Sequence, residues 1–376
     1  MPLHIAWRIL AHQKGRTALA LGGIFIAILL IFVELGFFIA VPQGGMLIYD
    51  HMRFDLLMAS NKYIFQGQSW QFPRQRLDEV GRNAGVAQVN PVYFGGAKWQ
   101  DPSGGLRIDI SVIGFDPKAK LFAGADGDSQ IAILERPDTV LVDSQTRPIF
   151  GPLQPGRVVD VNGRRITIGG EYVLGTGFLG LGIALASEAN FFRIFPNRPP
   201  QTVSFGLVTL KPGADPDAVA RELRAALPND TRVFTRPELA AHEVSFWTTR
   251  TGTGLIFGSG LIVAFIVGIM VLYQTLATQI TRQLPQFATL KAIGYSNGFL
   301  NGIVLIEAVL VMLIAFVPAL AAALGIYSVV RAQTLLPVNL TALELGGVFA
   351  VTLAMAVISA LLSVGRLRRA DPAEVF

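Results

Sequence analysis

Four long apolar runs limit what this chain can fold into more than any other feature of its sequence. They cover residues 17–41, 254–278, 302–329 and 345–364. As a helix rising 1.5 Å per residue, the first run is roughly 37 Å long, and the hydrocarbon core of a bilayer is about 30 Å thick. With 52% hydrophobic and 15% charged residues, the 376-residue chain is also too apolar for an ordinary soluble protein. The sequence therefore predicts an α-helical membrane protein with four transmembrane helices.

The first apolar run could instead belong to a cleaved signal peptide, since basic residues precede it and Ala40 is small. The apolar part of a signal peptide is about 7–15 residues long, which is much shorter than residues 17–41. We therefore expect an uncleaved span. The cytoplasmic segment before it, residues 1–16, fits two structures equally well: an amphipathic helix on the inner membrane surface, or a plain basic anchor.

The distribution of charge predicts the two sides of the membrane. Residues 1–16 and 279–301 contain Lys and Arg but no acidic residue, the tail at 365–376 is mainly basic, and residues 330–344 carry one Arg and one Glu. Because basic segments beside spans stay in the cytoplasm, we expect both termini and residues 279–301 to be cytoplasmic. Residues 42–250 are then periplasmic, in a multi-pass protein of the bacterial inner membrane. Cations placed beside spans in this way favour membrane lipid and exclude nucleic acid as a partner.

The outer block, residues 42–250, has the mixed pattern of an α+β domain. The expected parts are α+β segments at about 50–130 and 200–237, an all-β insert at 136–198 that splits them, and a stalk helix at 238–253. Asp215 is a suitable N-cap for a helix in the second segment. Asn162-Gly163 predicts the turn of a β-hairpin within the insert. The stalk helix is expected to lead straight into the second span.

Sequence motifs for catalysis and for metal binding are missing. The chain has no G-x-x-x-x-G-K-[ST] phosphate-binding loop, no H-E-x-x-H and no G-x-S-x-G. It has no cysteine, and its 4 histidines are scattered along the sequence. We therefore expect no catalytic residue, no metal site and no cofactor on this chain.

Two glutamates lie within the apolar runs, where an ionised side chain is costly. For Glu34, in the outer part of the first span, we favour a carboxylate solvated near the outer interface over a contact with a partner. Glu307, near the cytoplasmic end of the third span, fits burial against a neighbouring helix as well as exposure to water. Both are candidate intramembrane polar sites.

A short polar segment, Gln279–Ser296, joins the second and third spans with the sequence QITRQLPQFATLKAIGYS. It combines helix formers, two cations and a Gly stop, which favours an exposed helix over a ligand pocket. Its part Ala288–Tyr295, followed by Glu307, resembles the coupling motif of the MacB/FtsX-type permeases of ABC transporters. The tail at 369–375 is similar to the terminal motif of that family, and the resemblance covers essentially the whole chain.

Within that family, the segment QLPQFATLKAIGY and the lack of a fused ATPase domain resemble the DevC-like permease subunits most closely. The chain departs from the family motif at Pro285–Ala288, where the family has an acidic residue followed by Ile and Gly. The resemblance implies that one set of residues couples the permease to an ATPase: Pro285, Phe287, Ala288, Leu290, Lys291, Ala292, Ile293 and Gly294.

The resemblance also implies a porter-like subdomain split by a sabre-like β insert, and a role as the membrane subunit of a tripartite ABC exporter. Such a subunit would form a homodimer and work with a cytoplasmic DevA-like ATPase that binds ATP and Mg, a DevB-like periplasmic adaptor and a TolC-like outer-membrane channel. It would transmit movement of the ATPase to its periplasmic domain and so drive export of a hydrophobic, glycolipid-like cargo. An FtsX-like signalling subunit that regulates periplasmic hydrolases without transport is the alternative. A membrane-anchored enzyme is a third hypothesis, which lacks a catalytic motif.

Overall fold

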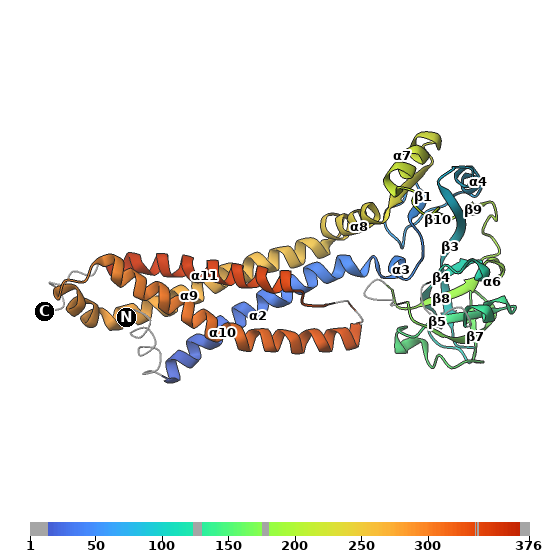
Figure 1. Cartoon of the computed structure of the whole chain (residues 1–376). Coiled ribbons are helices and arrows are strands. Elements are labelled where there is room, and N and C mark those ends of the chain that lie inside the picture. The colour runs from blue at the N-terminus through green and yellow to red at the C-terminus, as the bar shows by residue number, and fades with distance from the viewer. Residues whose placement is uncertain (1–13, 123–129, 175–179, 335, 337, 369–376) are drawn as a thin grey trace. The chain divides into compact units, whose positions relative to one another are not determined.

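A computed structural model describes residues 14–122, 130–174, 180–334, 336 and 338–368. The chain divides into two compact units, which we call the helical unit and the sheet unit (Figure 1). The helical unit contains residues 1–40, 252–333 and 338–376, and the sheet unit contains residues 41–251 and 334–337. Most of the expected N-terminal helix (1–16) and the tail motif (369–375) lie outside the described residues.

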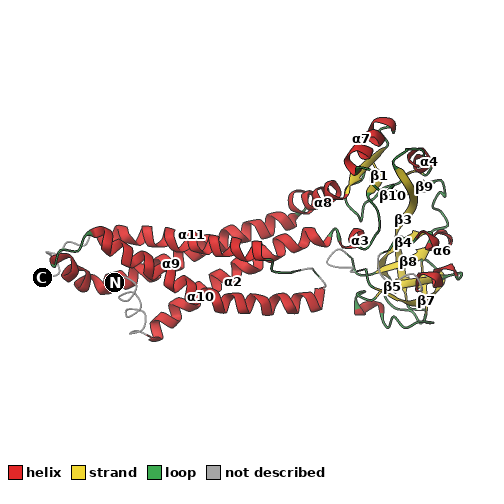
Figure 2. Ribbon diagram, viewed as in Figure 1, coloured by secondary structure: helices red, strands yellow, loops and turns green. Residues whose placement is uncertain are grey.

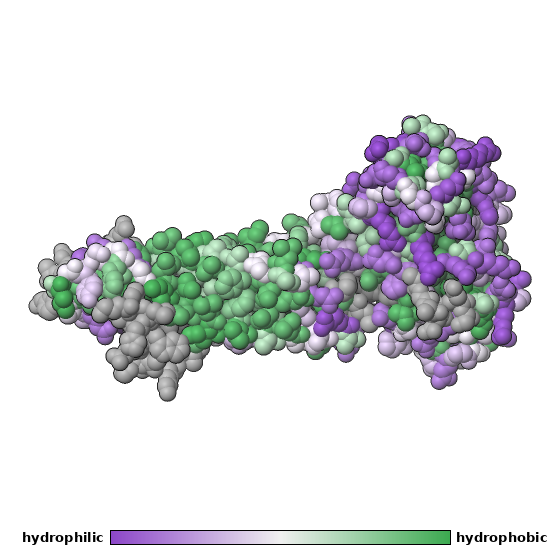
Figure 3. All heavy atoms as spheres, viewed as in Figure 1, coloured by the Kyte–Doolittle hydropathy of each residue, from purple (hydrophilic) through white to green (hydrophobic). Residues whose placement is uncertain are grey.

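Four helices form the helical unit (Figure 2). They are α2 (Lys14–Gly44), α9 (Gly252–Ala292), α10 (Asn297–Thr334) and α11 (Ala342–Arg368). Each contains a stretch that is long and apolar enough to cross a membrane, which confirms the four expected transmembrane helices. Figure 3 shows hydrophobic residues over most of the visible surface of these helices, as lipid contact requires.

Small residues let the helices of this unit approach closely. A side chain at Gly268 of α9 would collide with Met355 of α11, and its Cβ would lie 3.3 Å from that of Ala27 of α2. The Ser359 hydroxyl of α11 donates a hydrogen bond to the Ile269 carbonyl of α9 at 3.1 Å. Close contact at small residues and hydrogen bonds between helices are the forces that associate helices in a bilayer. Gly268 therefore lies at the point where α2, α9 and α11 meet.

A nine-stranded mixed sheet forms most of the sheet unit, with the order β11-β1-β10-β3-β4-β8-β5-β7-β6. The strands are β1 (Leu56–Ser60), β3 (Val86–Gln100), β4 (Ile108–Phe115), β5 (Thr139–Asp143), β6 (Val158–Val161), β7 (Arg164–Tyr172), β8 (Ile183–Ser187), β10 (Phe205–Leu210) and β11 (Thr231–Thr235), with β2 (Phe72–Pro73) and β9 (Thr202–Val203) paired separately. Every residue of β1 is buried because helices cover both faces of the sheet there. This large sheet with its helices confirms the expected mixed α and β domain.

The two faces of the sheet carry separate cores. On one face, β1 residues Leu56 and Met58 pack in a core with α4 (Gln75–Gly81), α6 (Glu188–Ile194) and α7 (Pro216–Ala226). On the other face, Leu57 and Ala59 pack in a core with α3 (Leu47–Asp50) and α8 (Arg236–Ser245). The alternation along β1 follows from the pleat of a strand, in which successive side chains point to opposite faces.

The segment at 136–198 differs from the all-β insert expected from the sequence. It contains helix α6 as well as strands β5 to β8, and these strands join the same sheet as β3 and β4. At its far end β6 pairs with β3, where Trp99 lies opposite Val161, so β3, β4, β8, β5, β7 and β6 form a closed ring of pairings. Closing the ring leaves no free strand edge within it, which explains why the insert does not form a separate body.

The structure confirms two local predictions from the sequence, a helix cap and a hairpin turn. Asp215 is the N-cap of α7, and its side chain accepts a hydrogen bond from the backbone N–H of Asp217 at 3.1 Å. Asn162 and Gly163 form the hairpin turn between β6 and β7 with φ values of 55° and 80°. Positive φ at both residues is what a two-residue type I′ turn requires.

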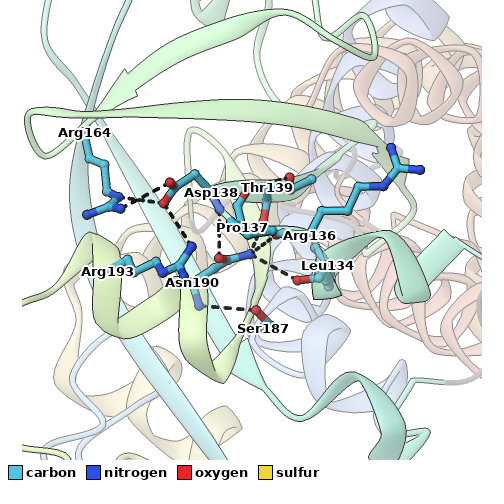
Figure 4. A network of polar contacts seen from close by, with 9 residues as sticks. All are labelled: Leu134, Arg136, Pro137, Asp138, Thr139, Arg164, Ser187, Asn190 and Arg193. Carbon is cyan, nitrogen blue, oxygen red and sulfur yellow. Dashed lines mark hydrogen bonds and ion pairs between the residues drawn. The ribbon is translucent and has the colours of Figure 1, made fainter.

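Asn190 of α6 fixes the start of β5 through a buried polar network (Figure 4). Its side-chain N–H groups donate to the carbonyls of Leu134, Arg136 and Thr139 at 2.8–3.1 Å, and its side-chain oxygen accepts from the Asp138 N–H at 2.9 Å. The Asp138 carboxylate in turn binds Arg164 of β7 at 2.6 Å. Hydrogen bonding to Arg164 lowers the pKa of Asp138, which keeps this pair ionised at neutral pH. The network has a structural role, because its buried groups bind one another.

The stalk helix expected at 238–253 is shorter than predicted and is not continuous with the second span. Helix α8 ends at Ser245, and Phe246–Arg250 form a π-helical turn. Thr251 is extended, with φ −105° and ψ 157°, and α9 begins at Gly252. The break at Thr251 follows Thr248 and Thr249, and threonine is a poor helix former.

Candidate functional site: the exposed end of α9

Helix α9 contains the predicted coupling segment as its last turns. It runs without interruption from Gly252 to Ala292, through Pro285. At 1.5 Å per residue, its 41 residues measure roughly 60 Å, about twice the thickness of a bilayer core. The polar end of α9 must therefore project beyond the hydrocarbon as a direct continuation of the second span. The sequence predicted a short exposed helix with a Gly stop in Gln279–Ser296, and the structure instead has one helix that runs from the span to Ala292.

A well-formed cap ends α9 and starts α10 after four residues. Gly294 has a φ of 104°, its N–H donates to the Lys291 carbonyl at 3.1 Å, and the Tyr295 N–H donates to the Leu290 carbonyl at 3.1 Å. This pair of bonds is the Schellman motif, for which glycine is preferred because of the positive φ. Ser296 caps α10 by accepting hydrogen bonds from the N–H of Phe299. The turn is thus fixed at both sides.

The predicted coupling residues separate into a buried and an exposed group. Phe287 is buried in the core of the helical unit, Leu290 is half-buried against that core, and Ala288 is also buried. The exposed group is Pro285, Lys291, Ala292, Ile293 and Gly294. The buried group holds the end of α9 against the other helices, and only the exposed group is accessible to a partner.

Ile293 is the most informative member of the exposed group, because its side chain is 71% exposed at the end of a helix. It lies next to the exposed cation Lys291, and residues 279–301 contain no acidic residue. An exposed apolar side chain beside a cation provides both buried area and charge selectivity for a protein partner. This end of α9, defined by Lys291–Gly294 with Pro285, is the candidate docking site.

The two glutamates of the apolar runs have different surroundings. Glu307 of α10 is 1% exposed, so the structure favours burial against neighbouring helices, the first of the two alternatives. Glu34 of α2 lies against Gly260 of α9, where an added Cβ would come within 2.5 Å of the carboxylate. One carboxylate oxygen of each has no hydrogen-bond partner among the described residues. Among the described residues, no hydrogen bond or ion pair joins Glu34 or Glu307 to the other or to the end of α9.

The sheet unit has two hollows, each of about 680 Å³. The first is lined by Lys98, Arg107, Arg198 and Asp160 among other residues, with no Ser, Thr or His in its lining. The second is lined by His242, Glu238 and Ser245 among others. There the His242 ring binds the Ile64 carbonyl at 3.0 Å, and Glu238 binds the Thr235 N–H and Arg224. His242 and Glu238 therefore have structural partners, and no hydrogen bond joins either of them to Ser245 among the described residues.

Comparison with known families identifies the class of protein. Residues 17–226, more than half of the chain, match the MacB-like periplasmic core domain, and residues 258–372 match the FtsX-like permease C-terminal domain. The chain therefore belongs to the MacB/FtsX-type permease family, as its coupling motif suggested. With its four apolar helices, it is a multi-pass inner-membrane protein with a periplasmic domain, which is the sheet unit.

Two solved structures are similar to part of the chain. The periplasmic region of MacB from Actinobacillus actinomycetemcomitans has 9% sequence identity and a TM-score of 0.34, with 50% of this chain and 91% of that chain covered. The extracellular domain of the noncanonic ABC-type transporter YknZ from Gram-positive bacteria has 14% identity and a TM-score of 0.33, with 48% and 99% covered. No curated protein matches this chain. Permeases of this family are components of ABC-type transporters or FtsX-like subunits that work with a cytoplasmic ATPase and are not catalytic by themselves.

Proposed function

We propose that this chain is the permease subunit of an ABC exporter, and that a separate cytoplasmic ATPase binds the exposed end of α9. The observation that carries the proposal is the continuity of α9 from the second span to the exposed Ile293. A single helix is stiff along its axis, so a push at its end moves the span as a unit. The chain contains no phosphate-binding loop, so ATP and Mg are bound by the partner.

The remaining parts of the proposal concern the other partners and the cargo. Both termini and the end of α9 are cytoplasmic, as the basic residues beside the spans favour. The permease forms a homodimer and moves its periplasmic domain in response to the ATPase, as in the DevC-like subunits. A DevB-like adaptor and a TolC-like channel then carry a hydrophobic, glycolipid-like cargo outward. The FtsX-like signalling role is the competing function.

Affinity purification of the full chain from its own membranes tests this proposal. We expect an ABC ATPase and a periplasmic adaptor to purify with the permease, because an exporter needs both. A parallel purification of the Ile293→Asp variant should retain the adaptor and lose the ATPase. An ATPase with a periplasmic hydrolase and no adaptor would establish the signalling role. Purification of the wild-type chain with no ATPase would contradict the proposal.

A further inference from the structure

Glu243 of α8 is a fully buried carboxylate with 0% exposure. The hydroxyl of Tyr63, in the loop after β1, donates a hydrogen bond to its Oε1 atom. That hydroxyl also forms a 2.8 Å hydrogen bond with the hydroxyl of Tyr49 in α3. No ion pair to Glu243 occurs within the described residues, so a buried carboxylate is held only by neutral groups, which is an expensive arrangement.

The position of Glu243 joins three segments of the sheet unit. Through Tyr63 it binds the loop after β1, a strand whose residues are all buried. Through Tyr49 it reaches α3, which follows the helix of the first span after a two-residue turn. An added Cβ at Gly45, within that turn, would lie 3.2 Å from its Oε2 atom. Glu243 itself lies in α8, which precedes the second span by one π-helical turn. One carboxyl group in α8 is therefore linked through Tyr63 to the loop after β1 and through Tyr49 to α3, and it lies close to Gly45.

The protonation of this carboxyl group changes near neutral pH. Burial raises the pKa of Glu243 to about 7, although the Tyr63 hydroxyl and the N–H groups of Gln66 and Trp247 favour the ionised form. Burial also raises the pKa values of Tyr49 and Tyr63 well above their usual range, so both tyrosines remain protonated. Within this group of three, the carboxyl group alone titrates near pH 7.

The other titratable and charged groups nearby do not replace the missing cation. The His242 ring stacks on Tyr63 at 5.4 Å, and burial lowers the pKa of His242, which keeps the ring neutral at pH 7. Arg236 of α8 donates to the carbonyls of Tyr49, Met52 and Phe54. Arg232 of β11 and Arg250 of the π-helical turn act on His242. None of these groups forms an ion pair with Glu243 among the described residues.

We propose that Glu243 is a positioning residue whose carboxyl group fixes α8 to Tyr63 in a proton-dependent manner, so that movement of α9 is passed to the sheet. This inference rests on the proposed function for its role in coupling. The buried group itself does not depend on that function. We call the contact between Glu243 and Tyr63 the joint. Ionisation of Glu243, which is buried without a cation, destabilises the folded state around the joint, so the joint opens more readily when the carboxyl group is ionised.

The sign of the pH effect follows from the raised pKa. Between pH 4.5 and pH 7 the folded chain binds more protons at Glu243 than the unfolded chain, so the stability due to this group falls as the pH rises. The contribution is fully present below about pH 4.5 and is lost above about pH 7. A shift of this size makes the folding equilibrium constant on the order of 10²-fold larger at pH 5 than at pH 8.

The first experiment measures thermal unfolding of the full chain in detergent at pH 5, 6, 7 and 8. Wild type is compared with Glu243→Gln, which keeps an acceptor for Tyr63 and does not titrate, and with Glu171→Gln, an exposed control in β7. The loss of stability from pH 5 to pH 8 should be smaller in Glu243→Gln than in wild type. In Glu171→Gln this loss should equal that of wild type. An equal pH dependence in wild type and Glu243→Gln would overturn the proton-dependent joint.

The second experiment measures the ATP hydrolysis rate of the ATPase between pH 6 and pH 8, with and without the purified permease. The change in this rate that the permease causes is the measure of coupling. We expect a change near pH 7 in wild type, no such change in Glu243→Gln, and loss of coupling at every pH in Glu243→Leu, which cannot bind Tyr63. Full coupling in Glu243→Leu would overturn the positioning role. If no ATPase binds the chain at all, the proposed function fails, and the unfolding experiment still decides whether the joint titrates.

Discussion

Replacing Ile293 by aspartate should strongly weaken productive binding of the ATPase. Ile293 is 71% exposed at the cap of α9, so the substitution removes a docking side chain without leaving a cavity. A central apolar anchor of a protein interface contributes about 2 kcal/mol or more, so binding should weaken by roughly thirtyfold or more. The measurement is a titration of the purified permease with its ATPase, followed by the ATP hydrolysis rate of the complex.

Leu106→Asp is the matched control for this prediction. Leu106 is 75% exposed, so the same change is made at a similarly accessible apolar side chain, in the sheet unit instead of the helical unit. The control should bind the ATPase as wild type does. Leu290→Asp is a less specific test, because Leu290 is half-buried against the helical core and its replacement also disturbs packing. Normal ATPase binding by a well-folded Ile293→Asp protein would contradict the docking site.

Replacing Gly268 by leucine should prevent the helices from assembling. Even the Cβ of a side chain at this position collides with Met355 of α11 and crowds Ala27 of α2. Overpacking of a closely packed contact costs about 3 kcal/mol or more when backbone must move, and three helices meet here. We expect the full chain in detergent to lose its single elution peak and to unfold at a lower temperature than wild type.

Gly325→Leu is the control for the helical unit. Gly325 lies in α10, and a Cβ added there would have no described neighbour within 4 Å, so the same substitution meets no obstacle. Both variants lengthen a side chain inside an apolar helix, and only one does so at a contact between helices. If Gly268→Leu and Gly325→Leu elute and unfold alike, the packing of α9 on α11 described above is wrong.

The sequence predicted the parts of the fold that depend on local composition. The four spans follow from apolar length, the cap at Asp215 from side-chain chemistry, and the turn at Asn162-Gly163 from the positive φ that glycine and asparagine tolerate. Each of these signals lies within a few residues of the structure it specifies. They are therefore readable without knowing which segments pair.

The parts that the sequence missed depend on contacts between distant segments. The ring of strands closes because β6 pairs with β3, where Trp99 lies opposite Val161, and no period in the sequence marks that pairing. Helix α9 continues through Pro285, although proline usually ends or kinks a helix, and the residues Phe287 and Ala288 that follow it are buried. At the candidate site, the sequence indicated a coupling segment whose role stays a prediction, and it did not separate the buried from the exposed members of that segment. It did not mark Glu243, since nothing within α8 indicates that Tyr63 binds it from 180 residues away.

Cross-linking from position 293 tests most directly whether an ATPase drives this permease through α9. The chain contains no cysteine, so Ile293→Cys places one photoactivatable label at the end of α9 without further changes. Leu106→Cys provides the same label in the sheet unit. In native membranes, the label at 293 should cross-link to an ABC ATPase on the cytoplasmic side, and the label at 106 should not. A label at 293 that reacts only with periplasmic proteins, or never with an ATPase, would contradict the docking of an ATPase at this helix end.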